Sequence, residues 1–447
     1  MKQFFAPKFL LAFFIILTSC ENGDRRRGNN QKTSQNSNSI PGAKMEPQTP
    51  LDATLKIYFE NTLSMDGYIN GNTNFKDVFR ELLVAADNEN DINLETEFYL
   101  LNNELTPTNF GVDNTKISEK LTPGSTAGKG NKGSSNFEEI LNTVLQNQEG
   151  DVISVIMADF IYSPEGEPDT PSALNKLRTY TQDAFLKAVN QNNDLETRVY
   201  SFTSDFDGTY YDINNKHIQG VKSRPYYYFV ITPGNLMPVF VDKIANQLKD
   251  APGYQNEALF TSANFKSIPT EILTATANNG RIKARGRDLE VVAYPKKGDL
   301  EFTVLADLTN LPVDDKYLLD KNNYNLANPE FFIKDIGLVK GKNIDFSLQG
   351  LIKMDPSTLV NINNKNYTHA ILFSSDGMVS EDLKIALKKR IPDWIKTAHS
   401  NNDQKIRNDS LEQTKTFGFG HLVEGVSRAY EQQGGNDEYF KLTIPIK

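Results

Sequence analysis

Residues 55–68 read LKIYFENTLSMDGY, and this stretch decides the fold expected for the first half of the chain. Every second residue from Leu55 to Phe59 is apolar, and the run is rich in β-branched and aromatic residues, which predicts a strand. Residues 60–64, ENTLS, then form a polar loop, and Gly67 closes the turn. We therefore expect a strand that ends in a short polar loop.

Oxygen-bearing side chains recur at every second position of this loop, at Glu60, Thr62 and Ser64. In an open α/β sheet, ligands bind at the carboxyl ends of the strands. Hard divalent cations such as Mg²⁺ prefer oxygen ligands. The loop therefore has the chemistry of a divalent-cation site.

Strand-like and helix-like stretches alternate from about residue 54 to residue 249. Apolar spacing predicts helices at 75–83, 137–145, 171–191 and 236–244, and strands at 96–101, 152–157, 197–203 and 226–231. The segment at 152–157, VISVIM, is apolar throughout, as expected of a central parallel strand buried on both faces. We expect an α/β domain over residues 54–252, with a doubly wound, mostly parallel sheet.

Short alternating runs separated by turn residues follow after residue 253. They lie at 289–294, 300–305, 344–348, 369–374, 383–387 and 439–446. This pattern predicts a β-rich, sandwich-like domain over residues 253–447. The helical spacing of Leu422, Val423 and Val426 predicts one helix before the last strand, and we expect the sole tryptophan, Trp394, in the core.

The amino terminus has the features of a lipoprotein leader. A basic start precedes an apolar core at 9–17 that is too short to span a bilayer as a helix. The sequence Leu17-Thr18-Ser19-Cys20 then resembles a bacterial lipobox. We expect a signal peptide over residues 1–19 and a lipid on Cys20; the alternative is an ordinary secretory signal with a coincidental cysteine.

Residues 20–53 are predicted to be a disordered tether, because they contain almost nothing to bury. Glu21 and Asp24 resemble export signals on surface lipoproteins of Bacteroidetes-type bacteria. We expect the protein in the bacterial cell envelope, at the outer membrane, attached through its lipid. The net charge of −9 and the pI of about 5.2 argue against a nucleic-acid partner.

The 60–64 loop resembles the metal-ion-dependent adhesion site of von Willebrand factor type A domains, whose first strand ends in Asp-x-Ser-x-Ser. This chain has Glu60 for the aspartate and Thr62 for the first serine, while Ser64 agrees. In the family, a second loop supplies a threonine and a third loop an aspartate; the matching residues are Ser135 and Asp159.

The resemblance covers a little under half of the chain. It implies a von Willebrand A-like fold and a divalent cation, Mg²⁺ first, held by these five residues. It also implies a protein or polymer partner, in the envelope or outside the cell, whose acidic group completes the coordination of the ion.

Each candidate ligand also has a structural interpretation. Ser135 with Glu138 matches a capping box, Asp159 can close a turn, and Glu60 and Thr62 can belong to a loop without an ion. Two other functions also stay open: a metal-dependent hydrolase of phosphate or sulfate esters, and a metal-free structural component of the envelope. We favour binding over catalysis because the chain has no HExxH or Gly-x-Ser-x-Gly motif.

Three other features are interpreted structurally. The glycine-rich loop at 124–133 lacks the spacing of a phosphate-binding loop. Asp205, Asp207 and Asp212 lack the spacing of an EF-hand and are expected in a solvated turn rather than around Ca²⁺. The aromatic run at 226–229 is expected in the core rather than on a binding surface.

Overall fold

The computed structural model describes residues 51–447 apart from some short gaps, and these described residues belong to one compact unit. The gaps are residues 91, 134–135, 164–169, 266, 275–277, 310, 312, 357–358, 360–364 and 436. Cys20, the leader and nearly all of the predicted tether therefore lie outside the described residues.

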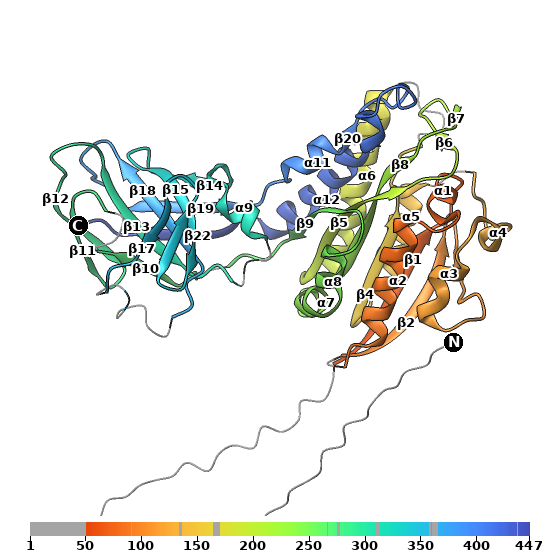
Figure 1. Ribbon diagram of the computed structural model, residues 1–447, viewed down its shortest axis with the longest axis horizontal. Coiled ribbons are helices and arrows are strands. Elements are labelled where there is room, and N and C mark those ends of the chain that lie inside the picture. The colour runs from red at the N-terminus through yellow and green to blue at the C-terminus, as the bar shows by residue number, and fades with distance from the viewer. Residues whose placement is uncertain are drawn as a thin grey trace, which may run out of the picture. The chain divides into compact units, whose positions relative to one another are not determined.

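A seven-stranded sheet with helices on both faces dominates the first part of the chain (Figure 1). Its strands are β1 (Leu51–Glu60), β2 (Ile92–Leu101), β3 (Leu105–Pro107), β4 (Val152–Ala158), β5 (Leu195–Asp205), β8 (Ser223–Pro233) and β9 (Tyr254–Thr261). The helices are α1 (Asp66–Ile69), α2 (Asn74–Asp87), η1 (Asn114–Lys116), α3 (Ile117–Lys120), α4 (Pro123–Thr126), α5 (Phe137–Gln146), α6 (Thr170–Gln191), α7 (Met237–Phe240), the π-helical η2 (Val241–Ala245) and α8 (Asn246–Lys249). A small hairpin, β6 (Tyr210–Tyr211) and β7 (His217–Ile218), lies between β5 and β8 in the chain.

The strand order in the sheet is β3-β2-β1-β4-β8-β5-β9. β1 pairs in parallel with β2 and with β4, whereas the β2–β3, β4–β8, β5–β8 and β5–β9 pairs are antiparallel. The expectation of a mostly parallel sheet is therefore wrong, and the sheet is mixed. The physical reason is that no crossover helix lies between β5 and β8, so these neighbours pair antiparallel through a looped connection.

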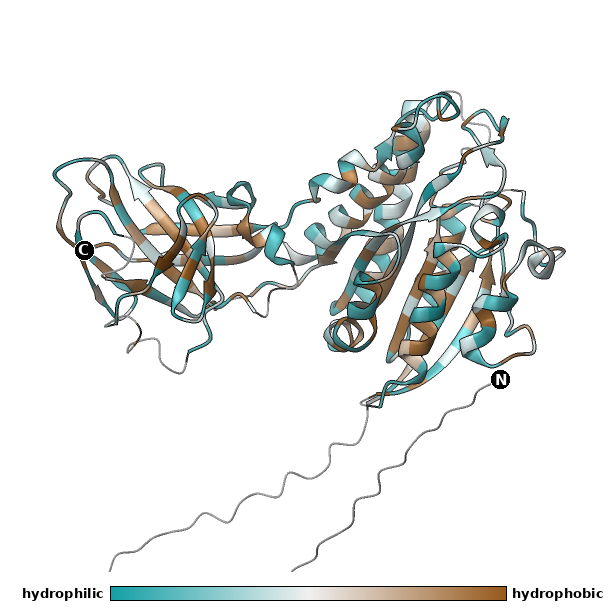
Figure 2. Ribbon diagram, viewed as in Figure 1, coloured by the Kyte–Doolittle hydropathy of each residue, from teal (hydrophilic) through white to brown (hydrophobic). Residues whose placement is uncertain are grey.

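Two hydrophobic cores cover the two faces of this sheet. One core joins the sheet to α2, α3, α7 and α8, and the other joins it to α5 and α6. In Figure 2 the strands of the sheet are mostly brown, and teal residues lie on the outer sides of the flanking helices. The apolar spacing predicted from the sequence is confirmed, since the apolar residues of α2 at 75, 78, 79, 82 and 83 are all buried.

The second part of the chain is mostly antiparallel. Its elements are β10 (Thr270–Leu273), β11 (Arg281–Arg285), β12 (Asp288–Ala293), β13 (Leu300–Ala306), α9 (Asp315–Leu319), η3 (Lys321–Asn323), β14 (Tyr324–Leu326), β15 (Phe332–Lys340), β16 (Asn343–Phe346), β17 (Gly350–Lys353), β18 (His369–Ser375), β19 (Leu383–Lys388), α11 (Asp393–Thr397), β20 (His399–Ser400), η4 (Glu412–Thr414), β21 (Thr416–Phe417), α12 (Phe419–Gly434) and β22 (Glu438–Ile444). A six-stranded sheet, β10-β13-β18-β15-β16-β17, and a three-stranded sheet, β14-β19-β22, contribute residues to one shared core.

Two elements beyond residue 252 join the seven-stranded sheet and its helices. β9 is the last strand of that sheet, paired with β5, and the sequence pattern gave no sign of it. The predicted helix around residue 426 is confirmed as α12, but it packs on α6 and shares the core of α5 and α6. Among the described residues, no helix is long and apolar enough to cross a membrane.

Candidate functional site

The loop after β1 is fixed by backbone hydrogen bonds to two neighbouring segments. The N–H of Asn61 donates to the carbonyl of Leu101 at 2.7 Å, which continues the pairing of β1 with β2. The N–H of Leu63 donates to the carbonyl of Lys132 at 3.0 Å, and the Asn61 amide donates to the carbonyl of Lys129 at 2.7 Å. The glycine-rich segment at 124–133 therefore packs on this loop as a structural support.

Two of the predicted ligand oxygens lie side by side in this loop. Thr62 Oγ1 and Ser64 Oγ are 3.1 Å apart. Two oxygens at right angles around Mg²⁺, each about 2.1 Å from the ion, would be about 3.0 Å apart. The spacing equally suits a hydrogen bond between the two hydroxyls, so it is compatible with a cation without requiring one.

Asp159 follows β4 directly and is only 1% exposed. Its Oδ1 accepts a hydrogen bond from the N–H of Ile161 at 3.1 Å, so the predicted turn interpretation holds for one oxygen. Burial raises the pKa of the Asp159 carboxyl, while the N–H of Ile161, the neighbouring Ser64 hydroxyl and the charge of Arg224 act in the opposite direction. Its Oδ2 has no hydrogen-bond partner among the described residues.

Arg224, near the start of β8, is the residue of this site that sequence reasoning missed. Its side chain is fully buried, Nη1 donates to the carbonyl of Gln413 at 2.8 Å, and the guanidinium lies 4.7 Å from the centre of the Tyr210 ring. Its charge interacts with Asp159 and Tyr68. The sequence feature that could have pointed to Arg224 is its position directly before Pro225 and the aromatic run at 226–229.

A segment from the second part of the chain, residues 399–417, packs over these groups; we call it the strap. Asp403 accepts hydrogen bonds from the Tyr210 hydroxyl and from the N–H of Ile213. The N–H of Tyr162, just after Asp159, donates to the carbonyl of Phe417 at 3.2 Å. The strap therefore helps to remove Asp159 and Arg224 from solvent.

The structure brings together three of the five predicted ligands: Thr62, Ser64 and Asp159. Glu60 ends β1 on the same face of the sheet as Tyr58 and is 1% exposed. Ser135 lies outside the described residues. The alternative interpretation of Ser135 was a capping box with Glu138. The N-cap of α5 is Asn136, whose side chain accepts a hydrogen bond from the N–H of Glu138 at 3.1 Å.

The donor set fits a small hard cation in two respects, the spacing of the Thr62 and Ser64 hydroxyls and the unpartnered Oδ2 of Asp159. Arg224 opposes such an ion, because a buried positive charge already interacts with the Asp159 carboxyl. Among the described residues, no three His, Cys, Asp or Glu side chains gather as a metal site.

The remaining sequence candidates have structural roles. Asp212 accepts from the N–H groups of Asn214 and Lys216 and so stabilises a turn, although it is buried and not solvated as expected. Asp205, at the end of β5, accepts from the N–H of Asn74, the first residue of α2. The aromatic run at 226–229 is completely buried, which confirms the prediction of a core position.

Comparison with known proteins adds no relative: no family model matches the chain, and neither does any curated protein.

Proposed function

We propose that this chain is a lipid-anchored protein of the bacterial cell envelope that binds a protein or polymer partner. The partner would dock where β1 and β4 end, against the exposed Leu63 and the half-buried Ser64, because Glu60, Thr62 and Asp159 are themselves buried. The observation that carries this proposal is that Thr62, Ser64 and Asp159, from segments almost a hundred residues apart, meet at that edge of the sheet. Ligands bind at this edge in open α/β sheets.

The resemblance to von Willebrand A domains supports the same proposal. The parallel arrangement β2-β1-β4, with α2 following β1 and α6 following β4, agrees with an α/β fold of that kind. The antiparallel β8 between β4 and β5 departs from the doubly wound order expected of that fold. The shared core of the six-stranded and three-stranded sheets likewise supports a sandwich-like second domain.

A divalent cation, if bound, would be held by Thr62, Ser64 and Asp159, with Glu60 and Ser135 as further donors. When bound, it would supply a positive centre, which an acidic group of the partner would approach from the side of the half-buried Ser64, since Glu60, Thr62 and Asp159 are buried. The competing form of the proposal is a metal-free binding module. The buried Arg224 favours this form, because its guanidinium already supplies positive charge beside Asp159.

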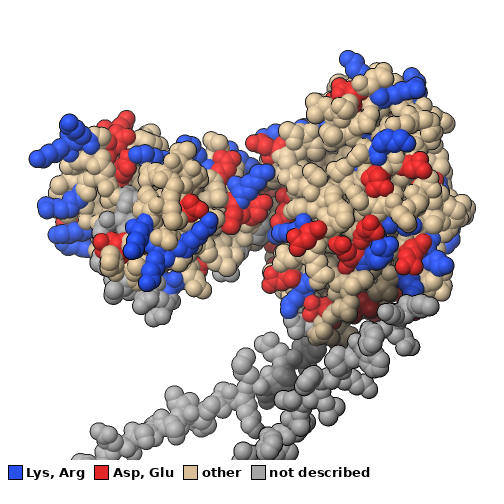
Figure 3. Space-filling model, viewed as in Figure 1, with Lys and Arg blue, Asp and Glu red and all other residues tan. Residues whose placement is uncertain are grey.

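The surface charge is compatible with a protein partner. On the face shown in Figure 3, acidic and basic side chains are interspersed over the elements of the seven-stranded sheet. Extended basic patches are the usual footprint of nucleic-acid binding. The charge pattern of this face therefore gives no support to a nucleic-acid partner.

Docking is tested by site-specific photo-cross-linking in living cells. Leu63 is 40% exposed in the loop after β1, and Met378 is 79% exposed in the second part of the chain. A photoreactive amino acid at position 63 should give a cross-linked partner band, and the same group at position 378 should not. Equal bands, or none at position 63, would contradict the docking edge.

The ion is tested separately by thermal unfolding of the full chain in detergent with Mg²⁺, Mn²⁺ or Ca²⁺. A ligand that binds only the native state raises Tm. The metal-dependent form predicts a rise of a few degrees that is lost in Asp159→Asn and kept in the control Asp205→Asn, at the end of β5. An unchanged Tm with all three ions would contradict the metal-dependent form and support the metal-free form.

The lipid anchor has its own test. Cys20→Ser should move the protein from the membrane fraction to the soluble fraction and abolish palmitate labelling, because the lipidated thiol is lost. Retention in the membrane fraction would contradict the lipobox interpretation.

A further inference from the structure

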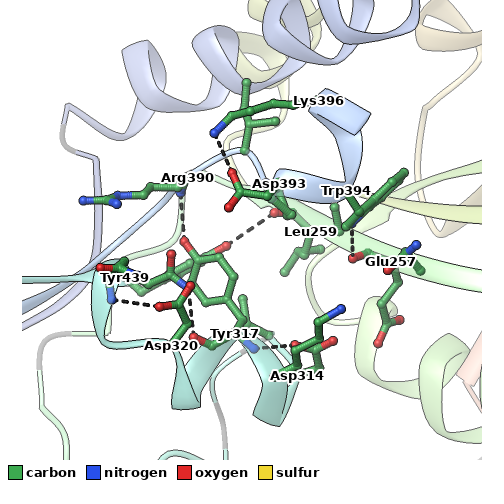
Figure 4. Close-up of a pocket in the computed structure, with 18 of the residues that line it drawn as sticks. Glu257, Leu259, Asp314, Tyr317, Asp320, Arg390, Asp393, Trp394, Lys396 and Tyr439 are labelled. Carbon is green, nitrogen blue, oxygen red and sulfur yellow. Dashed lines mark hydrogen bonds and ion pairs between the residues drawn. The ribbon is translucent and has the colours of Figure 1, made fainter. Parts of the chain in front are cut away.

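A second feature of the molecule is a cavity of about 480 Å³, lined by residues of β9, α9, α11 and β22. Figure 4 shows the three aromatic side chains of its lining, Tyr317 of α9, Trp394 of α11 and Tyr439 of β22. Trp394 is half-buried, so the expectation that it belongs wholly to the core is wrong. Small-molecule sites usually measure about 300–1,000 Å³, so the cavity is large enough for such a ligand.

The polar atoms of these three aromatic side chains are already used within the protein. The indole N–H of Trp394 donates to a backbone carbonyl of β9 at 3.1 Å, and the Tyr439 hydroxyl donates to another carbonyl of β9 at 3.3 Å. The Tyr317 hydroxyl donates to a carbonyl of β19 at 2.7 Å. These bonds hold the rings in place and close the edge of β9 here. The rings therefore offer a ligand apolar surface and no free polar group.

The charged side chains of the lining balance one another. Glu257 is paired with Arg198 at 3.0 Å. Asp393 is paired with Lys396 at 2.6 Å. A ligand with a net charge would meet as much repulsion as attraction, because the lining holds four acidic and four basic residues: Glu257, Asp314, Asp320 and Asp393, and Arg198, Lys316, Arg390 and Lys396.

Two acidic residues of the lining keep a free acceptor. Asp314 uses one oxygen to accept from the N–H of Tyr317 at 2.8 Å, and it has no ion-pair partner among the described residues. Asp320 uses one oxygen to accept from the N–H of Asn322 at 2.9 Å, and the same holds for its charge. The second oxygen of each carboxylate remains available to a ligand.

Two basic residues of the lining keep free donors. Lys316 and Arg390 are exposed, and within the described part of the chain neither has an ion-pair partner. In Figure 4, Arg390 and Asp320 lie on one side of the tyrosine rings and Asp314 lies on another. Hydrogen-bond donors and acceptors therefore surround the aromatic surface.

This combination favours a neutral ligand that is rich in hydroxyl groups. A hydroxyl both donates and accepts, so it can pair with a carboxylate or with a cation without adding net charge. A sugar ring also has faces of C–H groups that pack against aromatic rings. A purely apolar ligand would cover the free charges without replacing their hydrogen bonds to water, which costs free energy.

We propose that this cavity binds a neutral saccharide unit. The sugar ring packs against Trp394. Its hydroxyls donate to the carboxylates of Asp314 and Asp320. Other hydroxyls accept from Lys316 and Arg390. This site is separate from the docking edge at the end of β1 and does not depend on a partner or an ion there.

Trp394 provides the readout, because it is the only tryptophan in the chain. The probes are cellobiose, maltose and N,N′-diacetylchitobiose. Each is titrated into the full chain in a detergent without a sugar headgroup while the emission of Trp394 is recorded. We expect at least one of them to give a saturable change at millimolar concentration.

The charge of the ligand is tested in two ways. Binding of the neutral sugar should not change between about 50 and 500 mM NaCl, because a ligand without net charge has no attraction for salt to screen. Glucuronic acid, glucosamine and phosphocholine are the anionic, cationic and zwitterionic comparisons. Each should bind more weakly than the best neutral sugar.

Two variants and one matched control test the free carboxylates. Asp314→Asn and Asp320→Asn keep a side-chain oxygen that can cap the short helices, so folding should be intact. Each should weaken sugar binding about fivefold, because a charge-assisted hydrogen bond is replaced by a neutral one. Asp376→Asn, an exposed acidic residue outside the lining, should bind the sugar as the native chain does.

Three results would overturn the proposal. One is an unchanged Trp394 emission with all three sugars at tens of millimolar. Another is tighter binding of glucuronic acid, glucosamine or phosphocholine than of any neutral sugar, which would assign the cavity to a charged ligand. The third is full affinity in both Asp314→Asn and Asp320→Asn, which would place the sugar outside this cavity.

Discussion

At the scale of single residues, Arg224 is a fully buried cation. A guanidinium removed from water needs hydrogen bonds and a compensating charge. It finds the carbonyl of Gln413, the face of Tyr210 and the charge of Asp159. Its Nε and Nη2 have no hydrogen-bond partner among the described residues, so the arrangement depends strongly on the neighbouring carboxylate.

The first prediction concerns this charge. Arg224→Met should destabilise the fold by about 3 kcal/mol, because it leaves Asp159 buried without its compensating cation. Urea unfolding measures the change. Adding Asp159→Asn should recover part of the loss, and Arg285→Met, an exposed control, should stay within about 0.5 kcal/mol. A double variant no more stable than Arg224→Met would contradict the coupling.

A second prediction follows from the raised pKa of Asp159. Because the folded-state pKa exceeds the unfolded value, the folded state binds more protons between the two, and this carboxyl makes stability fall as pH rises through that window. Asp159→Asn has no such group. Its stability relative to the native chain should therefore increase from about pH 4 upward, by about 1.4 kcal/mol for each unit of pKa shift, as measured by unfolding across the pH range. A difference that does not change with pH would contradict this assignment.

At the scale of elements, the contact between α6 and α12 joins the two parts of the chain. Gly425 of α12 lies against α6 so closely that a Cβ there would be 2.6 Å from the carbonyl oxygen of Arg178 and 2.7 Å from Thr181 Cβ. The glycine therefore sets the distance between the two helices.

The third prediction tests this packing. Gly425→Ala should destabilise the protein by about 1–3 kcal/mol, because overpacking outweighs the gain of about 1 kcal/mol in helix propensity. Gly377→Ala, where no atom lies within 4 Å of the added methyl, is the matched control and should be nearly neutral. Thermal unfolding distinguishes them. Equal stability of the two variants would show that α6 and α12 can separate at little cost.

The elements themselves were largely predictable. The spacing of apolar residues identified β1, α2, α5, β4 and α6. A helix that buries one face, or a strand that buries both faces, needs apolar residues at fixed intervals within a short segment. The partners of these elements were not predictable in the same way. Nothing local to residues 419–434 indicates that α12 packs on a helix more than two hundred residues earlier.

At the scale of the whole molecule, the chain leaves the seven-stranded sheet after β9 and returns to it with α12. The domain boundary expected from the sequence, at residue 252, would separate β9 and α12 from the core to which they contribute residues. Residues of β9 and α12 that belong to this core include Ala258, Phe260, Phe419, Leu422, Val423, Val426 and Tyr430.

The fourth prediction is that a fragment of residues 54–252 does not fold stably. Its core around α5 and α6 would lose the cover of α12 and expose a large apolar surface. Strong dye binding and a non-cooperative thermal transition are expected, in contrast to the cooperative unfolding of the full chain. A cooperative transition without dye binding would show that the fragment is a domain by itself.

The sequence by itself determined most of the long helices and strands before β9 and the polar loop after β1, because these depend on spacing along a short segment. Only the tertiary structure decided the antiparallel position of β8, the burial of Arg224 beside Asp159 and the strap over both. These features arise from contacts between segments that are distant in the sequence. Such contacts produce no periodic spacing of apolar residues within either segment, so the sequence pattern does not reveal them.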